Sequence, residues 1–91
     1  MKLLRSTAFI RAARRTVKKY PHLTKDIQAA LELLSEDPFN ALLKTHKLKG
    51  ELKDSWACSV RYEVRTSFKF VDYKKQEAIL LETMGTHEEV Y

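Results

Sequence analysis

The spacing of apolar side chains predicts a helix in the first 20 residues. Ser6 or Thr7 can cap its N-terminus, and apolar positions then recur every three or four residues. This stripe consists of Phe9, Ala12, Ala13, Thr16, Val17 and Tyr20. Pro21 ends the helix because proline has no backbone N–H to donate. A short strand over Met1–Leu4 is expected before it.

A second helix is expected from Thr24, which can cap it, to the pair Asp37-Pro38, which ends it. Its apolar stripe consists of Ile27, Ala30, Leu31 and Leu34. Because only a short segment joins the two stripes, the helices are expected to form an antiparallel hairpin.

The second half of the chain has the pattern of strands. Trp56–Tyr62 is rich in aromatic and β-branched residues. From Glu63 the side chains alternate between two faces. One face holds Val64, Thr66, Phe68 and Phe70, and the other holds Glu63, Arg65, Ser67 and Lys69. The polar stretch Asp72–Gln76 is typical of a turn, and Ala78–Met84 is expected to form a last strand bounded by Gly85.

The order β-αα-βββ predicts one α+β domain over residues 1–91, with the helical hairpin on one face of an antiparallel sheet. A chain of 91 residues can bury one small core but not two. The other face of the sheet would then be open, and it would display Glu63 and Arg65.

Charge is distributed unevenly along the chain. The net charge is +5, but residues 1–50 carry +7 and residues 51–91 carry −2. Such a positive field attracts polyanions, whether nucleic acid, an anionic membrane or an acidic protein. The outer faces of the first helix carry five basic residues, which are either a solvated face or an RNA-contacting surface: Arg11, Arg14, Arg15, Lys18 and Lys19.

Several classes of protein are excluded. No stretch is long and apolar enough to span a bilayer, and arginines interrupt any secretory signal. The single cysteine, Cys58, excludes an internal disulfide and a cysteine cluster for metal, and it is expected to be buried. We therefore expect a cytoplasmic protein that needs neither a metal nor another cofactor.

Three segments contain side chains that can carry chemistry. They are the basic loop from His46 to Gly50, the pair Glu63 and Arg65, and the stretch from Gly85 to Tyr91, which includes His87. If the last strand lies beside the strand of Arg65, His87 comes near Arg65 and the His46 loop.

Imidazoles, a carboxylate and cations suit RNA cleavage by internal transesterification. A base removes the proton of the ribose 2′-OH, an acid protonates the departing 5′-oxygen, and cations offset the charge of the phosphorane. Histidine serves both proton transfers because imidazole titrates near neutral pH. The 2′-OH is itself the nucleophile, so this reaction needs no metal.

The chain resembles the RelE/ParE superfamily of bacterial toxins, nearest the RelE branch that includes YafQ-type toxins. The matching segments are H-K-L-K-G at 46–50, W-A-C-S-V at 56–60, E-V-R at 63–65 in place of the usual D-x-R, and G-T-H-E-E-V-Y at 85–91. The N-terminal helix pair fits too, so the resemblance covers essentially the whole chain.

The resemblance implies the toxin of a type II toxin–antitoxin module. Such a toxin is a metal-independent mRNA endoribonuclease (an mRNA interferase) that inhibits translation, commonly by cutting mRNA in the ribosomal A site. The implied partners are a cognate antitoxin, mRNA and the ribosome with its 16S rRNA. Operator DNA would be contacted only through the antitoxin complex, and no membrane is involved.

Carried over by position, the resemblance implies a role for each of five residues. His87 is expected to act as general acid or to stabilise the leaving group. His46 or Glu63 is expected to be the base, and Arg65 to hold the scissile phosphate. Tyr91 is expected to stack on a base or to orient it. The RNA-contacting residues would be Lys47, Lys49, Arg11, Arg14, Arg15 and Lys18.

Two departures from the YafQ-type pattern leave other functions open. Ser59 stands where a second strand histidine is usual, and Val64 stands where a tryptophan is usual. One alternative is a ParE-like inhibitor of DNA gyrase. The other is a catalytically degenerate toxin that acts only by binding its antitoxin as a co-repressor.

Structural interpretations also stay open for three residues. Arg65 can form an ion pair with Glu63 or Glu82. Tyr91 can fray, because it is the last residue of the chain. Trp56 is expected in the core or at its rim, although a solvent-facing tryptophan can stack on RNA.

Overall fold

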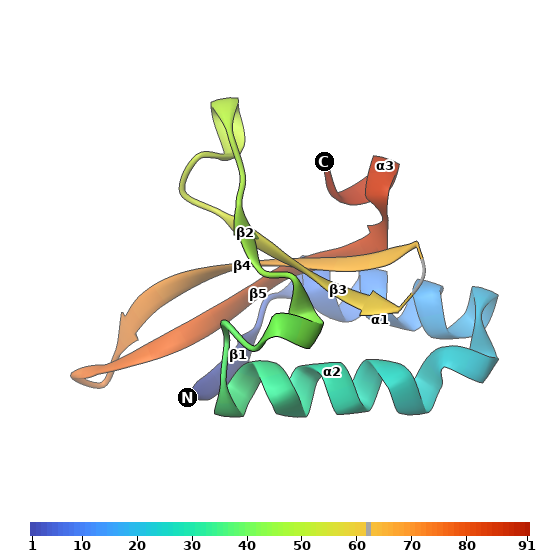
Figure 1. Cartoon of the computed structure of the whole chain (residues 1–91), viewed down its shortest axis with the longest axis horizontal. Helices are drawn as coiled ribbons and strands as arrows, with labels where there is room; N and C mark the ends of the chain where they lie inside the picture. The colour runs from blue at the N-terminus through green and yellow to red at the C-terminus, as the bar shows by residue number, and fades with distance from the viewer. Residues whose placement is uncertain (62) are drawn as a thin grey trace.

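A five-stranded sheet with two long helices on one side forms the framework of the molecule (Figure 1). The computed structural model describes residues 1–61 and 63–91. No helix within those ranges is long and apolar enough to cross a bilayer. The elements are β1 (Lys2–Arg5), α1 (Thr7–Lys19), η1 (Pro21–Leu23), α2 (Thr24–Glu36), η2 (Ala41–Leu43), β2 (His46–Lys47), η3 (Gly50–Leu52), β3 (Trp56–Arg61), β4 (Val64–Tyr73), β5 (Gln76–Thr86) and α3 (His87–Val90), where η marks a 3₁₀ turn.

The strand order β1-β5-β4-β3-β2 confirms the α+β class and refines two details of the sheet. β3, β4 and β5 pair in antiparallel fashion, as expected. The start of the segment expected to be a basic loop, His46–Lys47, instead forms a fifth strand, β2, antiparallel to β3. β1 instead pairs with β5 in parallel, from Lys2 beside Ala78 to Arg5 beside Leu81, so the sheet is mixed at that edge. The alternation of apolar side chains is the same in both kinds of strand, so it does not reveal the direction of β1.

The first helix starts as predicted, and the second starts differently. The Ser6 hydroxyl accepts a hydrogen bond from the backbone N–H of Phe9 at 3.0 Å and so caps α1. Thr24 was expected to cap α2, but it is the first helical residue, and its hydroxyl donates to the carbonyl of Pro21. η1 runs directly into α2, so the N-cap position of α2 is occupied by Leu23, the last residue of η1, which has no side chain that can cap a helix.

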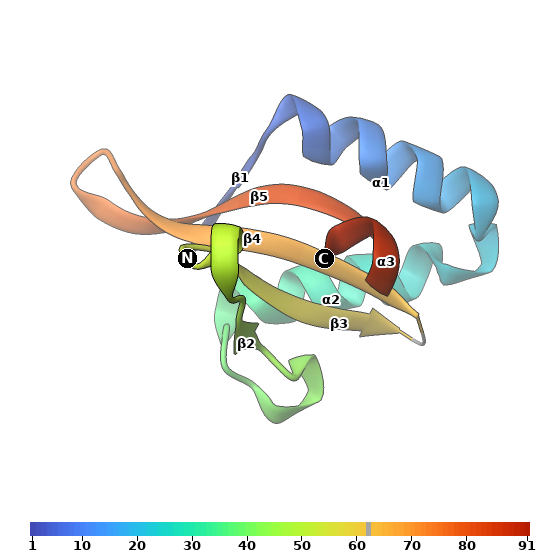
Figure 2. The ribbon, with the colours of Figure 1, turned by 90° about the horizontal axis from the view of Figure 1, so that it is seen from above.

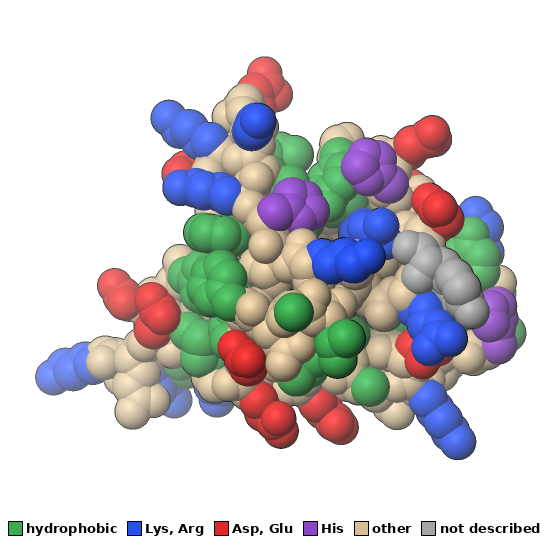
Figure 3. Space-filling model, viewed as in Figure 1, with side chains coloured by type: hydrophobic (Ala, Val, Ile, Leu, Met, Phe, Trp, Pro, Cys, Tyr) green, Lys and Arg blue, Asp and Glu red, His purple; other side chains and the backbone are tan. Residues whose placement is uncertain are grey.

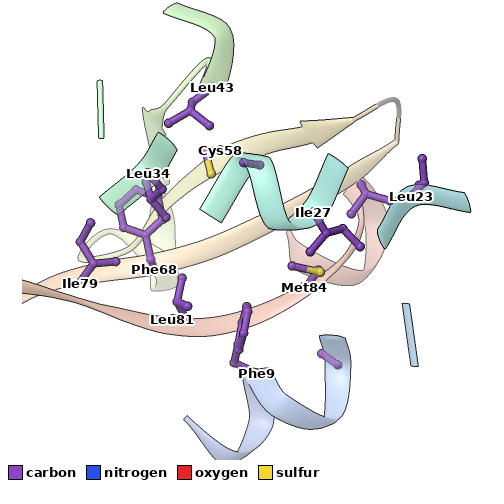
Figure 4. Close-up of a cluster of buried hydrophobic side chains, with 13 residues drawn as sticks. Phe9, Leu23, Ile27, Leu34, Leu43, Cys58, Phe68, Ile79, Leu81 and Met84 are labelled. Atoms are coloured by element: carbon purple, nitrogen blue, oxygen red, sulfur yellow. The ribbon is translucent and has the colours of Figure 1, made fainter. Parts of the chain in front are cut away.

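The core lies between the sheet and the two helices. Figure 2 shows α2 passing beneath β3 and α1 running alongside β5, and these are the strands that each helix contacts. Side chains from both helices and from β3, β4 and β5 meet in one cluster (Figure 4). Phe68 and Leu34 are fully buried, as are Ile79 and Leu81. The predicted inward face of β4 is confirmed as far as Phe68.

The opposite face of the sheet is not open, contrary to expectation. Ala57 and Ser67 lie on that face, yet they are only 0% and 5% exposed. The segment between β2 and β3, which includes η3, and the short helix α3 both rise on this side of the sheet (Figure 1). Leu48, Leu52 and Val90 from these two segments line a small pocket with Ser67. The polar alternation of β4 could not show that later and earlier segments fold back over it.

The hairpin between β4 and β5 is tighter than the predicted turn over 72–76. Tyr73 pairs with Gln76, so only two residues connect the strands. Lys74 and Lys75 both have positive φ, 51° and 65°. A two-residue turn of this kind matches the right-handed twist of the strands that it joins. It places the hairpin turn at the end of the molecule farthest from α3 (Figure 1).

Candidate active site

Four of the five residues predicted for catalysis lie together, on the sheet face opposite α1 and α2. The hydroxyl oxygen of Tyr91 is 2.9 Å from Nε2 of His46. The Tyr91 ring meets the His87 ring edge-on, with the ring centroids 4.2 Å apart. The positive charge of Arg65 acts to lower the pKa of the Tyr91 phenol, so the guanidinium lies near this hydroxyl group. Figure 3 shows two neighbouring histidines near the top of the molecule, with Lys and Arg side chains directly below them.

His46 is held at both ring nitrogens. Its Nδ1 lies 3.0 Å from the carbonyl oxygen of Lys44. A carbonyl oxygen can only accept a hydrogen bond, so Nδ1 carries a proton, and in the neutral imidazole Nε2 then has the free lone pair. Lys44 ends η2 in the left-handed region, with φ of 50°, and this turn brings its carbonyl back toward the ring. The backbone of Lys44 thereby selects the tautomer of His46 that presents a basic Nε2 to the site.

Tyr91 supplies the hydrogen that this nitrogen accepts. Burial raises the pKa of the Tyr91 phenol, and the positive charge of Arg65 only partly opposes that rise. The phenol is therefore neutral at physiological pH, and its hydroxyl donates to His46. Arg65 lies on β4 directly between Ser59 of β3 and Gly85 of β5, so the sheet fixes the base of its side chain.

The short helix α3 positions both Tyr91 and His87. A capping box closes its N-terminus, where the Thr86 N–H donates to the Glu89 carboxylate at 3.0 Å. At its other end, the Tyr91 N–H donates to the His87 carbonyl at 3.0 Å. Val90 is buried beneath the turn. One helical turn, fixed at both ends, thus holds the two side chains edge to face.

Gly85 lets α3 fold close over β5. A Cβ at this position would lie 3.0 Å from Cβ of Glu89 and 3.1 Å from its Oε1. The sequence suggested that Gly85 bounds the last strand, but it lies inside β5, which continues to Thr86. Sequence reasoning also missed Thr86 and Glu89, although T-x-x-E at 86–89 is the sequence signature of a capping box.

Hydrogen bonds to Thr86, from its backbone and then its side chain, lower the pKa of Glu89. The positive charges of Lys19 and Arg15 lower it further. Glu89 is therefore ionised across the physiological range, and its charge helps to retain the capping box. The same charges show that the C-terminal half of α1 lies near α3.

Comparison with known proteins gives a match in structure alone, since no protein-family model and no curated protein matches the chain. A YoeB/ParE toxin from Agrobacterium tumefaciens superposes with a TM-score of 0.76, at 17% identity over 96% of this chain and 99% of its own. A metal-bound toxin from Helicobacter pylori gives a TM-score of 0.77, at 25% identity over 100% of this chain and 99% of its own. The E. coli DinJ–YafQ toxin–antitoxin complex contains a chain with a TM-score of 0.76, at 18% identity over 99% of this chain and 96% of its own.

This is the RelE/YafQ-like toxin fold. It confirms the fold class expected from the sequence and the fold that the resemblance implied. Because YoeB/ParE and YafQ toxins both superpose on the chain, the fold by itself does not distinguish among the activities weighed above.

Glu63 is the one predicted catalytic residue that lies outside the group around Tyr91. It was expected on the strand face that displays Arg65, but β4 begins at Val64 and Glu63 lies exposed in the preceding turn. β3 ends at Arg61, which pairs with Val64 at the start of β4. Alternation cannot tell the last residue of a tight turn from the first residue of a strand. Tyr62, the expected end of the β3 strand, lies outside the described residues.

The residues of this chain that were predicted to contact RNA lie on two separate surfaces. Lys47 and Lys49 are exposed on the segment that starts with β2. The residues of α1 are exposed along its outer side: Arg11, Arg14, Arg15 and Lys18. Of these four, Arg15 is placed near α3 by its effect on Glu89. The rest of the basic helix is a surface of its own rather than part of the group around Tyr91.

Cys58 takes no part in this chemistry. It is fully buried, as expected, and burial raises its pKa to about 12 despite the opposing charge of Arg65. The thiol is therefore protonated and unreactive at neutral pH. Among residues 1–61 and 63–91, no three His, Cys, Asp or Glu side chains gather where they could hold a metal ion.

Replacing Gly85 with alanine is expected to displace α3. The added methyl group would lie within 3.0 Å of Glu89, and overpacking of this kind costs about 1–3 kcal/mol of the free energy of unfolding. Nuclear Overhauser contacts from the Tyr91 ring to His46 and His87 should weaken or vanish, while urea denaturation measures the loss of stability.

Gly50→Ala is the matched control. Gly50 has a φ of +69°, but no atom lies within 4 Å of a Cβ placed there. It should therefore cost about 1–2 kcal/mol through backbone strain alone and leave the ring contacts in place. Intact Tyr91 contacts in Gly85→Ala would show that the close approach to Glu89 does not position α3.

Proposed function

We propose that the protein is the toxin of a type II toxin–antitoxin module and that it cleaves mRNA in the ribosomal A site. Cleavage would proceed by attack of the ribose 2′-OH and would need no metal. The observation that carries this proposal is the contact of Tyr91 with His46, His87 and Arg65, because these are the acid–base and phosphate-binding groups that the reaction requires.

His46 is the base in the proposed mechanism. Its Nε2 already accepts a hydrogen bond from a hydroxyl group, that of Tyr91, at 2.9 Å. The ribose 2′-OH would take the place of that hydroxyl and give its proton to Nε2 as its oxygen attacks the adjacent phosphorus. Glu63, the alternative base, is less suited, because it lies in the exposed turn before β4.

His87 and Arg65 complete the reaction. His87 would donate a proton to the departing 5′-oxygen, so that the P–O5′ bond breaks without releasing an alkoxide. Arg65 would hold the non-bridging oxygens, whose charge increases in the phosphorane. The products are a 2′,3′-cyclic phosphate and a free 5′-hydroxyl, and the proton gained by His46 balances the one lost by His87. Tyr91, with its hydroxyl displaced from His46, would stack on a neighbouring base or orient it.

The proposed partners follow from the fold and the charge. A cognate antitoxin is supported by the shared fold with a chain of the DinJ–YafQ toxin–antitoxin complex, and operator DNA would be bound only through such a complex. The exposed basic residues of α1, together with Lys47 and Lys49, would contact mRNA and 16S rRNA through phosphates. The protein would act in the cytoplasm, where translating ribosomes are, and without a membrane.

Cleavage of a translated message tests the proposal. In a purified translation system, the protein should create new in-frame 5′ ends on one mRNA, mapped by primer extension, and EDTA should not prevent cleavage of naked RNA where that occurs. His87→Ala should lower the cleavage rate by about 10²–10⁴-fold through loss of the general acid. His22→Ala, an exposed histidine of η1 outside the site, should cleave as the unchanged chain does.

The outcomes separate the possibilities. Cuts that require Mg²⁺ would contradict the mechanism, and equal rates for His87→Ala and His22→Ala would contradict the role of His87. Cuts on naked RNA would keep the nuclease and remove the ribosome requirement. A folded protein that cuts neither substrate would instead be a gyrase-binding toxin or a catalytically degenerate one.

A further inference from the structure

Three aromatic rings form a surface cluster that the proposed cleavage does not use. Phe39 lies in the loop after α2, Trp56 begins β3, and Phe70 lies on β4. The ring centroids are 5.3 Å apart for Phe39 and Trp56, 5.8 Å for Phe39 and Phe70, and 5.7 Å for Trp56 and Phe70. Phe39 is 59% exposed although it belongs to this cluster. Figure 3 shows hydrophobic side chains gathered on the left of the molecule, below projecting Lys and Arg side chains.

The neighbouring rings leave part of the Phe39 ring open. Its ring is nearly parallel to that of Phe70, with 24° between the planes, so one face is occupied. Trp56 meets it at 80°, so this contact is edge to face. Phe39 nevertheless stays 59% exposed, so ring surface remains available for a further contact. A planar ring placed there would continue the stack that Phe70 and Phe39 begin.

Positive charge accompanies this open ring. The Nζ of Lys47 lies 5.9 Å from the Trp56 ring centroid. Lys44 and Lys49 are exposed on the same segment. A planar group carried on a polyanion fits an aromatic face bordered by lysines, since stacking and phosphate contact are then satisfied together. An apolar protein segment would leave these lysines without counter-charges.

β2 connects the cluster to the candidate active site. His46 pairs with Ala57 and Lys47 pairs with Trp56. Successive side chains of a strand point to opposite faces, so His46 faces Tyr91 while Lys47 faces the aromatic cluster. The two sites are thus one residue apart along the chain, on either side of a two-residue edge strand. A single strand of RNA that leaves the first site across this edge reaches the second.

We propose that Phe39, backed by Phe70 and Trp56, is a stacking subsite for a base of single-stranded RNA, with Lys47 contacting its phosphate. This inference rests on the proposed function, because the base that it places on the cluster belongs to the RNA strand that is cut near His46. The subsite would read no particular base, since every base offers a flat π face. It would add affinity for unpaired RNA and would position the strand relative to His46.

Trp56 provides a direct assay because it is the only tryptophan. The probe is a short single-stranded 2′-O-methyl oligoribonucleotide, which lacks the nucleophile and cannot be cleaved by this mechanism. Its addition to the intact chain should quench the Trp56 fluorescence in a saturable way, and added salt should weaken the binding. Phe39→Leu should lower the affinity by about 10-fold, within the range of base stacking on an aromatic ring, whereas Phe39→Tyr should retain it.

Leu42→Ala is the matched control. Leu42 lies in η2, three residues after Phe39, and is 79% exposed, so it is an apolar surface side chain without a flat ring. Its replacement should leave the RNA affinity unchanged. Equal affinities for Phe39→Leu and the unchanged chain, with both folded by thermal denaturation, would overturn the proposal. An oligonucleotide that fails to quench Trp56 would also overturn it and would assign the cluster to a protein partner.

The failure of this inference is distinguishable from that of the proposed function, because the probe is never cleaved. Phe39-dependent binding by a chain that does not cut translated mRNA would keep the stacking subsite and remove the nuclease. Cleavage of mRNA that is unaffected by Phe39→Leu, without loss of oligonucleotide affinity, would keep the nuclease and remove the subsite.

Discussion

Arg65→Ala is expected to slow the cleavage of translated mRNA by about 10²–10³-fold, since a preorganised group that offsets transition-state charge contributes this much. Arg65 is half-buried, lies between Ser59 and Gly85 in the sheet, and carries its positive charge near the Tyr91 phenol. Its loss would therefore remove the phosphate-binding charge from the group around Tyr91. Single-turnover rates on a ribosome-bound message give the measurement.

Two further variants test whether the charge and the geometry of Arg65 cause this loss of rate. Arg65→Lys keeps the charge without the forked donors of the guanidinium, so its rate should lie between those of arginine and alanine. Lys69→Ala removes a cation of the same strand that pairs with Glu82 at 3.6 Å instead of with the site. Its rate should stay within about 2-fold of the unchanged chain, as expected for loss of an exposed ion pair. Similar rates for Arg65→Ala and Lys69→Ala would remove Arg65 from the mechanism.

Phe68→Ala should remove about 3–5 kcal/mol from the free energy of unfolding, measured by urea denaturation at neutral pH. Phe68 is fully buried among side chains of both helices and three strands. Its ring also meets that of Phe70, with centroids 5.5 Å apart. Because small domains are stable by only about 5–15 kcal/mol, the variant should be partly unfolded at 37 °C.

Leu42→Ala controls for the loss of apolar volume alone. Since Leu42 is 79% exposed, its replacement should change the stability by less than about 0.5 kcal/mol. A Phe68→Ala chain as stable as Leu42→Ala would mean that the cluster in Figure 4 is not the core on which folding depends.

The regular elements were predictable because burial follows simple periods. In α1, the stripe from Phe9 to Thr16 faces the hydrophobic core. In β4, the alternating side chains from Val64 to Phe68 do the same. What the periods could not supply is pairing between distant segments. Neither the parallel contact of β1 with β5 nor the burial of Ala57 on the face opposite the helices leaves a trace in local spacing.

The candidate site was predictable in membership but not in geometry. The sequence placed His46, His87 and Tyr91 in recognisable segments, and the structure brings them together with Arg65. The tautomer of His46 depends on a backbone carbonyl at Lys44, which no side-chain pattern encodes. Glu63 was wrongly predicted to lie on the strand. It lies in the turn before β4, but its polar side chain fits the alternation of that strand, so the pattern does not show where β4 begins.

The position of β5 in the sheet also constrains how the protein can be made. β5 is the last strand in the sequence, yet it is hydrogen-bonded to β1, whose partners lie 76 positions away, and to β4. It also packs against α1 and α3. During synthesis from the N-terminus, α1 and β1 therefore lack the strand that they contact most until β5 emerges. The nascent chain stays without its core, and without its assembled site, until β5 has been synthesised.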